Sequence, residues 1–386
     1  MPPAESTMES RHQSGDGRLR LTMLGPSPKH PGGITKVVES WRRGGLEQLV
    51  NLREIHTGRW DDPRPRQAAH ATIALVRLLL NLARRDSDVI FLHVSTGGSI
   101  LRKFAAAVLA RLFGVPYVAQ IHSGEYEDWV ARSFSARWIS HLLFSNAAAV
   151  VVVSKRWAGL ARRLGASEVW ALPNALSLDE REAFAAAAAN VATASETHST
   201  LLYYGRWSPV KGPDRIASAL AAVSQRDYEI RLFGNGDRDW LEEAFAVLPP
   251  GHVTIGGWID LSAKAIELAG ATVLIVPSRA EGFGQVLIEA RAAGTPVVAS
   301  AVGGVVEVLA DYDLALLVPA GDDDALRSAL ERVVRGEWPR ADARAVRVPD
   351  LPERFHAESV VGDLAAMLGR ISDPAGTILE RSPRVH

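Results

Sequence analysis

The chain has 386 residues, of which 47% are hydrophobic and 23% are charged, values typical of a soluble globular protein with two domains of ordinary size. Its formal net charge of −1 offers no global basic field, so nucleic acid is not predicted as a partner. Cysteine is absent, which excludes disulfides, thiolate nucleophiles and cysteine-ligated metals, and fits a reducing compartment.

The two ends of the sequence predict disordered margins. Residues 1–17 are polar and lack the apolar stretch of a signal peptide, and residues 372–386 combine prolines with mixed charge. No run of about 18 uncharged apolar residues occurs, so a transmembrane helix is not expected.

Short apolar strands alternate with helices from residue 18 to residue 176, which predicts a doubly wound α/β domain. The nearly continuous apolar run at 148–153 is typical of a parallel strand that is covered on both faces. Strands are expected at 18–25, 88–95, 116–122, 147–154 and 169–172, and helices at 34–49, 68–85, 99–113, 136–146 and 155–164.

A second α/β series, residues 200–350, follows an alanine-rich and then Ser/Thr-rich segment, 177–199, that predicts a linker. Residues 351–371 are expected to form a last helix that packs back on the first domain. Two doubly wound domains place a cleft between the carboxyl ends of two parallel sheets, where loops and helix N-termini meet a ligand. Strands of the second domain are expected at 200–205, 228–234, 252–257, 271–277, 296–301 and 315–318.

Glycines and cations at the predicted strand ends suit a phosphate-bearing ligand. Gly32 and Gly33 precede the first helix and offer backbone N–H groups to an anion, although a plain turn is the stronger explanation of this motif alone. Arg206 follows a strand end and Lys211 opens the next helix, so together they could neutralise a diphosphate. The alternative is that both are ordinary solvated cations.

Two further loops carry weaker signals. Gly234 lies in a Phe-Gly-Asn-Gly-Asp segment that resembles part of a dinucleotide fingerprint but lacks its full glycine pattern. Gly257 could present its backbone to a nucleobase, whereas the adjacent Trp258 is interpreted as a core residue. Asp322 begins an acidic run that is interpreted as a helix N-cap, so neither a metal site nor a cofactor is predicted.

The most informative segment, residues 277–289, contains two glutamates eight positions apart. Glu281 lies in a glycine-rich loop and is expected to point into the cleft, and Glu289 lies on the next helix, within reach of a bound nucleoside. Carboxylates accept hydrogen bonds from paired sugar hydroxyls. The loop residues between them place backbone amides near a helix N-terminus, where an anion or sugar oxygens are favoured: Gly282, Phe283 and Gly284.

These motifs, followed by Gly-Thr-Pro-Val-Val-Ala and a Gly-Gly pair, occur in the order seen in glycosyltransferase family 4, and the chain resembles these retaining enzymes of GT-B fold. The resemblance implies that Arg206 and Lys211 hold the donor diphosphate. It implies that Glu281 binds the donor-sugar hydroxyls and Glu289 the nucleotide ribose. His122, in Gln-Ile-His-Ser-Gly, matches a family histidine near the donor sugar.

The function implied by the resemblance is retaining transfer of a sugar from a UDP- or GDP-sugar to a hydroxyl of a glycan or lipid-linked acceptor. Envelope glycan, polysaccharide or glycolipid biosynthesis is favoured, with the first domain on the acceptor side. A nucleotide-sugar epimerase of the same architecture and a secondary-metabolite glycosyltransferase stay open as alternatives. A nicotinamide oxidoreductase is disfavoured, because no Gly-x-Gly-x-x-Gly follows the first strand. One departure is Asn174-Ala175, where the family has Asn-Gly, and no ligand role is assigned there.

Cations and aromatic residues gather in the first domain, and such a face could rest on an anionic membrane. Ordinary amphipathic packing explains them equally well. The predicted location is the cytoplasm, with peripheral contact at the inner face of the cell membrane left open. The residues concerned are Arg102, Lys103, Phe104, Arg111, Phe113, Arg132, Phe134, Arg137 and Trp138.

Overall fold

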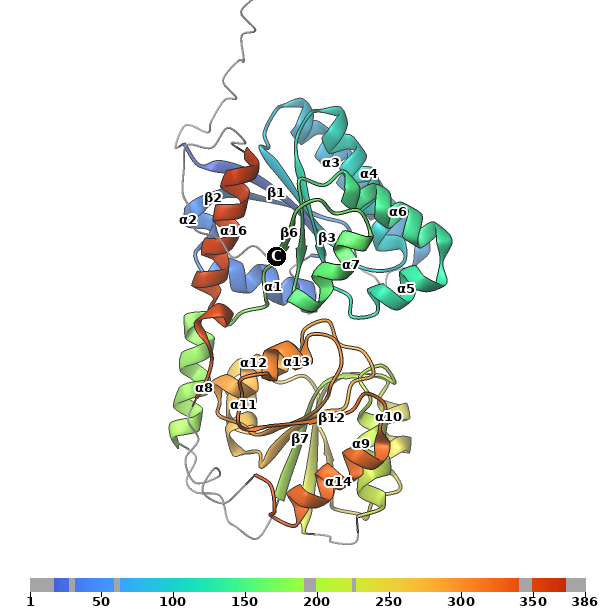
Figure 1. The fold of residues 1–386 in the computed structure, drawn as a ribbon, viewed down its shortest axis with the longest axis vertical. Helices are drawn as coiled ribbons and strands as arrows, with labels where there is room; N and C mark the ends of the chain where they lie inside the picture. Colours follow the sequence, from blue (N-terminus) through green and yellow to red (C-terminus); the bar gives the residue numbers. More distant parts are fainter. Residues whose placement is uncertain are drawn as a thin grey trace, which may run out of the picture.

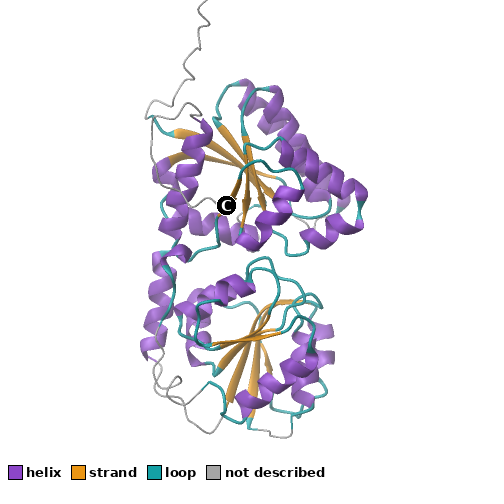
Figure 2. Cartoon of the chain, viewed as in Figure 1, coloured by secondary structure: helices purple, strands orange, loops and turns teal. Residues whose placement is uncertain are grey.

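The computed structural model describes residues 17–27, 32–58, 63–190, 199–223, 227–339 and 349–372. The ends for which the sequence predicts disorder, residues 1–17 and 372–386, lie outside these ranges except for Gly17 and Ser372. Figures 1 and 2 show two α/β domains along the long axis of the molecule, each with helices on both sides of a central sheet. No helix of the described ranges is long and apolar enough to span a bilayer.

The N-terminal domain is built on a six-stranded parallel sheet of order β2-β1-β3-β4-β5-β6. Every residue of the central strand β3 is buried, which explains why its sequence is apolar except for His93. The strand β2 was missed by the sequence analysis because it lies at the sheet edge and mixes charged residues with apolar ones. The strands are β1 (Leu19–Gly25), β2 (Val50–His56), β3 (Val89–Val94), β4 (Tyr117–Ile121), β5 (Ala149–Val152) and β6 (Val169–Ala171).

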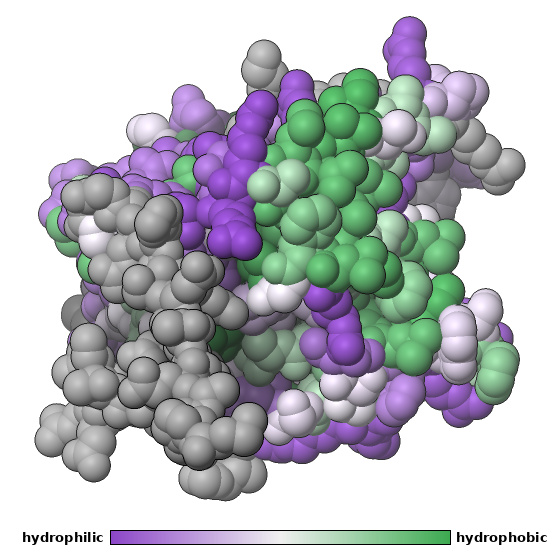
Figure 3. All heavy atoms as spheres, turned by 90° about the horizontal axis from the view of Figure 1, so that it is seen from above, coloured by the Kyte–Doolittle hydropathy of each residue, from purple (hydrophilic) through white to green (hydrophobic). Residues whose placement is uncertain are grey.

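The helices of this domain differ from the predicted ones at three places, one of which is residues 155–164, where a 3-10 turn precedes the helix. The helix expected at 34–49 is divided, because Gly45 takes a left-handed φ of 94° that ends one helical segment and begins the next. A short helix, α5, was not predicted. The helices are α1 (Gly33–Arg43), α2 (Leu46–Leu49), α3 (Arg64–Ala83), α4 (Gly98–Leu112), α5 (Tyr126–Arg132), α6 (Phe134–Ser145), the 3-10 turn η1 (Lys155–Trp157) and α7 (Ala158–Arg163). Seen from this end of the molecule, apolar side chains gather in a broad surface patch (Figure 3).

The C-terminal domain has a second parallel sheet, of order β12-β11-β10-β7-β8-β9, and its six strands were all predicted. They are β7 (Ser199–Trp207), β8 (Tyr228–Gly236), β9 (Val253–Ile255), β10 (Val273–Val276), β11 (Val297–Ser300) and β12 (Ala315–Val318). The helices are α9 (Pro213–Ala221), α10 (Arg238–Phe245), α11 (Leu261–Gly270), α12 (Gln285–Ala292), α13 (Val305–Leu309) and α14 (Asp323–Val334). The side chain of Asp322 accepts from the backbone N–H of Ala325 at 2.8 Å and so caps α14, as expected.

The chain crosses between the domains twice, and the two crossings lie side by side (Figure 1). The outgoing crossing leads into α8 (Leu178–Asn190), and the return passes through the 3-10 turn η2 (Glu353–Phe355) into α16 (Ala357–Ser372). Leu176 exchanges backbone hydrogen bonds with this return segment, donating to Phe355 and accepting from Ala357, both at 2.9 Å. Apolar residues of α16, including Leu364 and Met367, then pack into the core of the N-terminal domain.

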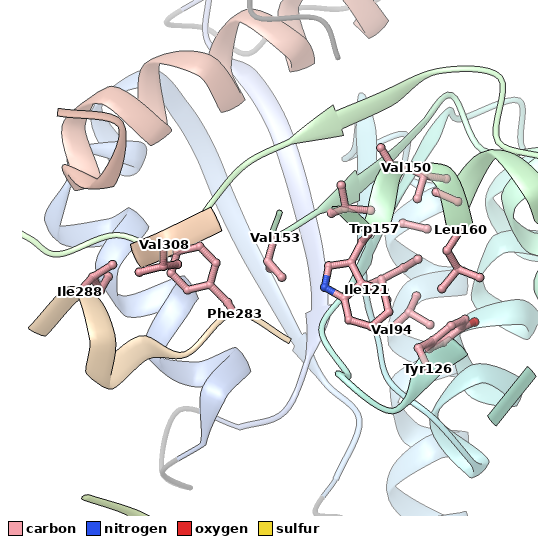
Figure 4. Close-up of a cluster of buried hydrophobic side chains, with 14 of the residues drawn as sticks. Val94, Ile121, Tyr126, Val150, Val153, Trp157, Leu160, Phe283, Ile288 and Val308 are labelled. Carbon is pink, nitrogen blue, oxygen red and sulfur yellow. The ribbon is translucent and has the colours of Figure 1, made fainter. Parts of the chain in front are cut away.

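A single cluster of buried side chains joins the two domains (Figure 4). Val153 and Trp157 of the N-terminal domain belong to it together with Phe283 and Val308 of the C-terminal domain. The indole Nε1 of Trp157 also donates to the carbonyl of Gly282 at 2.9 Å. The domains therefore meet through dry, hydrogen-bonded packing at this point.

Candidate active site

The carboxyl ends of β4 and β10 bring two loops into backbone contact across the domain boundary. A Cβ placed on Gly124 would lie 2.5 Å from the nitrogen of Gly282 and 2.6 Å from the carbonyl carbon of Glu281. A Cβ on Gly282 would lie 3.0 Å from the carbonyl oxygen of His122. Glycine at both positions is what allows the loop of Glu281 to approach His122 this closely.

Glu281 is held by Lys211, one of the cations that the sequence assigned to the diphosphate. The Lys211 Nζ lies 2.6 Å from the Glu281 Oε2, and the Ser278 hydroxyl donates to the same oxygen at 3.4 Å. The turn that carries Lys211 depends on Gly212, which has a φ of 70° and comes so close to the carbonyl of Pro277 that a Cβ would lie 2.5 Å away. The two sequence motifs thus form one charged pair.

Glu289 lies on α12 and is almost fully buried, with 1% of its side chain exposed. Both of its oxygens accept from the Nζ of Lys264 at 3.0 Å. The Nζ of Lys36, on α1 of the other domain, lies 3.6 Å from Glu289 and 2.5 Å from Glu180 on α8. The carboxylate assigned to the ribose therefore lies in an ion-pair cluster that spans the two domains.

Trp258 is exposed, which corrects its interpretation as a core residue. Its side chain is 55% exposed and stands edge-on to the ring of Tyr204, with 5.3 Å between ring centroids. Lys264 Nζ lies 4.1 Å from the centre of the Tyr204 ring. The short strand β9 is the edge strand of its sheet. Trp258 lies just after this strand, so few other side chains cover its indole ring. An accessible aromatic face thus lies beside the Glu289 cluster.

His122 contacts a second histidine that the sequence analysis did not single out. Its Nε2 lies 2.9 Å from the Nδ1 of His93, on β3. Burial, helped by the charge of Lys103, lowers the pKa of His122 to about 3, and burial also holds the pKa of His93 well below its usual range. Lys103 is itself buried, donates to the Thr57 hydroxyl at 3.0 Å and has its pKa lowered to about 7 by burial. The two imidazoles are accordingly neutral near pH 7.

A pocket of about 290 Å³ opens in the N-terminal domain on the other side of His93. It lies between α1 and the carboxyl ends of β1 and β2, and its polar lining includes Arg42, Glu54 and His56. Arg42 also makes an ion pair with Glu54 at 3.1 Å. His93 therefore lines this pocket and also contacts His122, whose loop approaches the loop that carries Glu281.

Several predicted donor-binding residues have structural roles of their own. The ring of Phe283 is 3% exposed and packs edge-on against Phe355 at 5.8 Å, so its side chain belongs to the core and only its backbone can face a donor. A Cβ on Gly234 would lie 1.8 Å from the carbonyl oxygen of Gly205, which shows that close packing of β8 on β7 requires glycine there. Gly284 begins α12 with a left-handed φ of 93°.

The remaining predicted residues lie at the rim. Arg206 is exposed at the end of β7, and its backbone carbonyl accepts from the Tyr203 hydroxyl at 2.7 Å. Gly257 is exposed and accepts from the backbone N–H of Gly234 at 3.2 Å. Gly32 and Gly33 are exposed at the start of α1, where the extended backbone of Gly32 suits any residue. The loop before them, residues 28–31, lies outside the described residues.

Sequence reasoning overlooked the partners of the predicted residues, above all Lys36, Lys264, Tyr204 and His93. Three of these side chains come from elements that were predicted correctly, but no motif distinguishes them from ordinary surface or core residues. The sequence did contain one signal for Lys36. This residue lies in the first turn of the helix that follows the Gly-Gly turn, and a cation at a helix N-terminus can help to bind an anion.

The two halves of the chain match two glycosyltransferase families. Residues 21–175 match the glycosyl transferase 4-like domain, and residues 187–346 match the family described as glycosyl transferases group 1. These matches coincide with the two α/β domains. Both are glycosyltransferase families, in agreement with the family predicted from the motifs.

Individual proteins agree with this assignment. The chain is 32% identical to phosphatidyl-myo-inositol mannosyltransferase of Mycobacterium leprae over 274 residues, which cover 68% of this chain and 69% of that protein. It is 28% identical to 2-deoxystreptamine glucosyltransferase of Streptomyces kanamyceticus over 361 residues, which cover 87% and 84% of the two chains.

Solved structures show the same fold. HepE of Anabaena, in complex with UDP and glucose, superposes with a TM-score of 0.69 at 17% identity, covering 91% of this chain and all of that one. At this level of identity the likeness concerns the fold alone. The predicted class, two Rossmann-like domains in the GT-B arrangement, is confirmed.

Proposed function

The chain belongs to glycosyltransferase family 4, the enzymes of GT-B fold identified above, and we propose that it transfers a hexose, with retention, from a UDP- or GDP-sugar to a cyclitol hydroxyl. One observation carries the proposal: the loop of Glu281, whose carboxylate pairs with Lys211, meets the backbone of the loop of His122 across the domain boundary. The relatives named above are transferases, so an epimerase is not proposed.

The donor would lie along the C-terminal wall of the cleft. Arg206 and Lys211 would bind the diphosphate, since a guanidinium fork and an ammonium group both suit phosphate oxygens. Glu281 would accept hydrogen bonds from the sugar hydroxyls, and Glu289 from the ribose once Lys36 moves aside. The exposed face of Trp258 is available to stack on the base. The structure of HepE is a complex with UDP and glucose, which supports a nucleotide as a ligand of this fold.

The chemistry follows from charge development on the leaving phosphate. The bond between the anomeric carbon and the phosphate oxygen breaks, and the acceptor oxygen bonds to the same face of that carbon. The leaving phosphate oxygen takes the acceptor proton. Lys211 and Arg206 would stabilise the negative charge on that phosphate, a contribution that is larger in a dry, preorganised site than in water. No protein base and no metal ion is assigned to this step.

The acceptor would occupy the pocket beside His93. Arg42, Glu54 and His56 line it, and such groups donate to and accept from a ring that bears several hydroxyls. Neutral His122 lies between this pocket and the sugar, where an uncharged imidazole can contact a hydroxyl without opposing the positive charge on the reacting carbon. The mycobacterial relative, named for phosphatidyl-myo-inositol, favours a lipid-linked cyclitol and hence glycolipid or envelope glycan synthesis. We place the protein in the cytoplasm, at the inner face of the membrane.

A second candidate is a soluble aminocyclitol acceptor, as in secondary metabolism. Its support is the 2-deoxystreptamine glucosyltransferase, which aligns over 87% of this chain. The carboxylates of the pocket, Glu39 and Glu54, would suit ammonium groups on such a ring.

A binding screen followed by a transfer assay tests the proposal. Thermal unfolding would be measured with UDP, GDP, ADP, TDP and NAD, because a ligand that binds only the folded state raises its melting temperature. We expect UDP or GDP to stabilise the protein and Lys211→Ala to weaken that stabilisation. The matching sugar nucleotide is then supplied with phosphatidylinositol, inositol phosphate or 2-deoxystreptamine, and the stereochemistry of the product is read by NMR. Stabilisation by NAD alone, or an inverted product, would overturn the assignment.

A further inference from the structure

A carboxylate of the C-terminal domain binds the start of a helical segment in the N-terminal domain. The 3-10 turn η1 and the helix α7 follow each other without a break over residues 155–163. Ser154 stands at the N-cap position, where a serine hydroxyl usually accepts from a backbone N–H of the first turn, but here it makes no such hydrogen bond. Instead, the Glu307 Oε2 accepts from the backbone N–H of Lys155 at 2.7 Å. The first N–H of this helical segment is thus bound across the domain boundary.

The same turn makes a second hydrogen bond to the C-terminal domain. The indole Nε1 of Trp157 donates to the carbonyl of Gly282, the residue after Glu281, at 2.9 Å. Trp157 is only 6% exposed, so this hydrogen bond lies in a largely dry environment, where it is stronger than in water. Both donors therefore belong to one turn of the N-terminal domain. We call the two hydrogen bonds together the η1 contact.

The helix that carries Glu307, α13, is packed against the loop of Glu281. A Cβ on Gly303 would lie 1.6 Å from the carbonyl oxygen of Glu281. A Cβ on Gly304, the N-cap residue of α13, would lie 2.7 Å from the carbonyl oxygen of Gly282. Because such close packing leaves neither element room to shift alone, the position of Glu307 is tied to that of the Glu281 loop.

We propose that Glu307 is a positioning residue for the transfer reaction: through the η1 contact it keeps the loop of Glu281 aligned with the loop of His122. Its carboxylate is bound to the other domain, and we assign it no contact with donor or acceptor. The nucleotide is held by the C-terminal domain, whereas His122 belongs to the N-terminal domain, so misalignment should lower turnover more than nucleotide affinity. The inference rests on the proposed function, which places donor and acceptor on opposite sides of the domain boundary.

Domain alignment can be measured directly, because the chain contains no cysteine. Leu112→Cys and Val247→Cys place one spin label on each domain, at side chains that are 76% and 62% exposed. Pulsed electron paramagnetic resonance then gives the distribution of distances between the labels, with no sugar nucleotide present. We expect this distribution to broaden or shift when Glu307→Ala is added. Glu307→Gln should preserve it, because an amide oxygen also accepts from the backbone N–H of Lys155.

The matched control for this measurement is Glu242→Ala. Glu242 is an exposed carboxylate of the same domain, and its ion pair with Arg238 at 2.7 Å lies within one helix. Removing it changes the charge of the protein by the same amount as Glu307→Ala but breaks no contact between the domains. The distance distribution and the turnover of Glu242→Ala should therefore match those of the wild type.

Turnover gives the second readout, measured in the cysteine-free chain. Glu307→Ala should lower kcat on the order of tenfold, while the affinity for UDP or GDP stays within about twofold of the wild-type value. Glu307→Gln should keep kcat within about threefold of wild type, because a neutral hydrogen bond is roughly half as strong as a charge-assisted one. The melting temperature of both variants should stay close to that of the wild type, since each domain retains its own core.

Three results would each overturn the proposal: an unchanged distance distribution in Glu307→Ala, an unchanged kcat in that variant, or a Glu307→Gln variant that behaves as Glu307→Ala does. The proposed function is judged separately, by the nucleotide screen on the wild-type protein. A distance distribution that depends on Glu307 in a protein that binds neither UDP nor GDP would keep the alignment role and remove the proposed function. A working transferase that is indifferent to Glu307 would remove the positioning role alone.

Discussion

Gly124→Ala probes whether the domain contact at the site is the one used in catalysis. The new Cβ would lie 2.5 Å from the nitrogen of Gly282 and 2.6 Å from the carbonyl carbon of Glu281, whereas ordinary contacts of this kind begin near 3.4 Å. The two loops must therefore separate by roughly 1 Å, and a misplacement of that size lowers turnover on the order of 100-fold when reacting groups are carried on opposite walls.

The matched comparison is Gly303→Ala, where a Cβ would lie 1.6 Å from the carbonyl oxygen of Glu281 within the same domain. That clash cannot be relieved by moving the domains apart, so Gly303→Ala should lower the melting temperature as well as activity. Gly124→Ala should leave the melting temperature nearly unchanged, and Gly270→Ala, with open space around its Cβ, should change neither quantity.

The assay is the release of nucleoside diphosphate at saturating donor and acceptor, with melting temperatures from the same preparations. Wild-type turnover in Gly124→Ala would refute the reasoning, because the observed apposition of the loops would then be irrelevant to the reaction. Loss of activity together with a large loss of stability would equally refute it, since the clash would then not be absorbed between the domains.

Three other perturbations have expected outcomes. Lys211→Ala should lower kcat/KM by about 100-fold or more, measured by nucleoside diphosphate release, because the leaving phosphate loses a fixed cation; unchanged kcat/KM would remove its assigned role. Lys264→Met should cost about 3 kcal/mol in urea unfolding, because Glu289 would be left buried with only Lys36 nearby, and adding Glu289→Gln should restore most of it. Since burial lowers the pKa of His122 from 6.5 to about 3, the unfolded chain takes up a proton that the folded protein refuses. His122 should therefore lower the unfolding free energy by up to about 1.4 kcal/mol for each pH unit as the pH falls from 6.5 to 3, and buried His93 adds to this slope in the same direction. His122→Asn should flatten that slope in urea titrations; an unchanged slope would contradict the cause given.

The two sheets could be predicted because buried parallel strands are almost continuously apolar. This pattern can be recognised without knowing which strands are neighbours in the sheet. The strand Val50–His56 escaped because an edge strand has one covered side and can carry charges, as Arg53 and Glu54 do here. The candidate site residues were expected in loops at the carboxyl ends of strands, where ligands bind in this fold, and the structure has Glu281 and His122 in such loops. Which groups meet across that cleft could not be predicted, because it depends on how the two domains are oriented.

The type of an aromatic residue alone does not indicate whether its side chain is buried or exposed. Trp258 was expected inside and is exposed, whereas the side chain of Phe283, in the loop expected to present backbone amides to the donor, fills the core beside Phe355. Both are large aromatic residues next to glycines, so local sequence gives them the same appearance. The pairing of Lys36 with Glu289 joins residues 253 positions apart and is invisible to any reading of local spacing.

The return of the chain into α16 has a consequence for biosynthesis. Trp41 and its neighbours in the first domain are covered by Val360, Leu364 and Met367, which leave the ribosome more than 300 residues later. Until then a nascent chain carries a half-built N-terminal domain with a bare hydrophobic side, the kind of surface on which chaperones act and aggregates begin. The domain that is made first is thus completed last, and a chain that stops short of α16 should be recognised by the cell as unfinished rather than as a smaller enzyme.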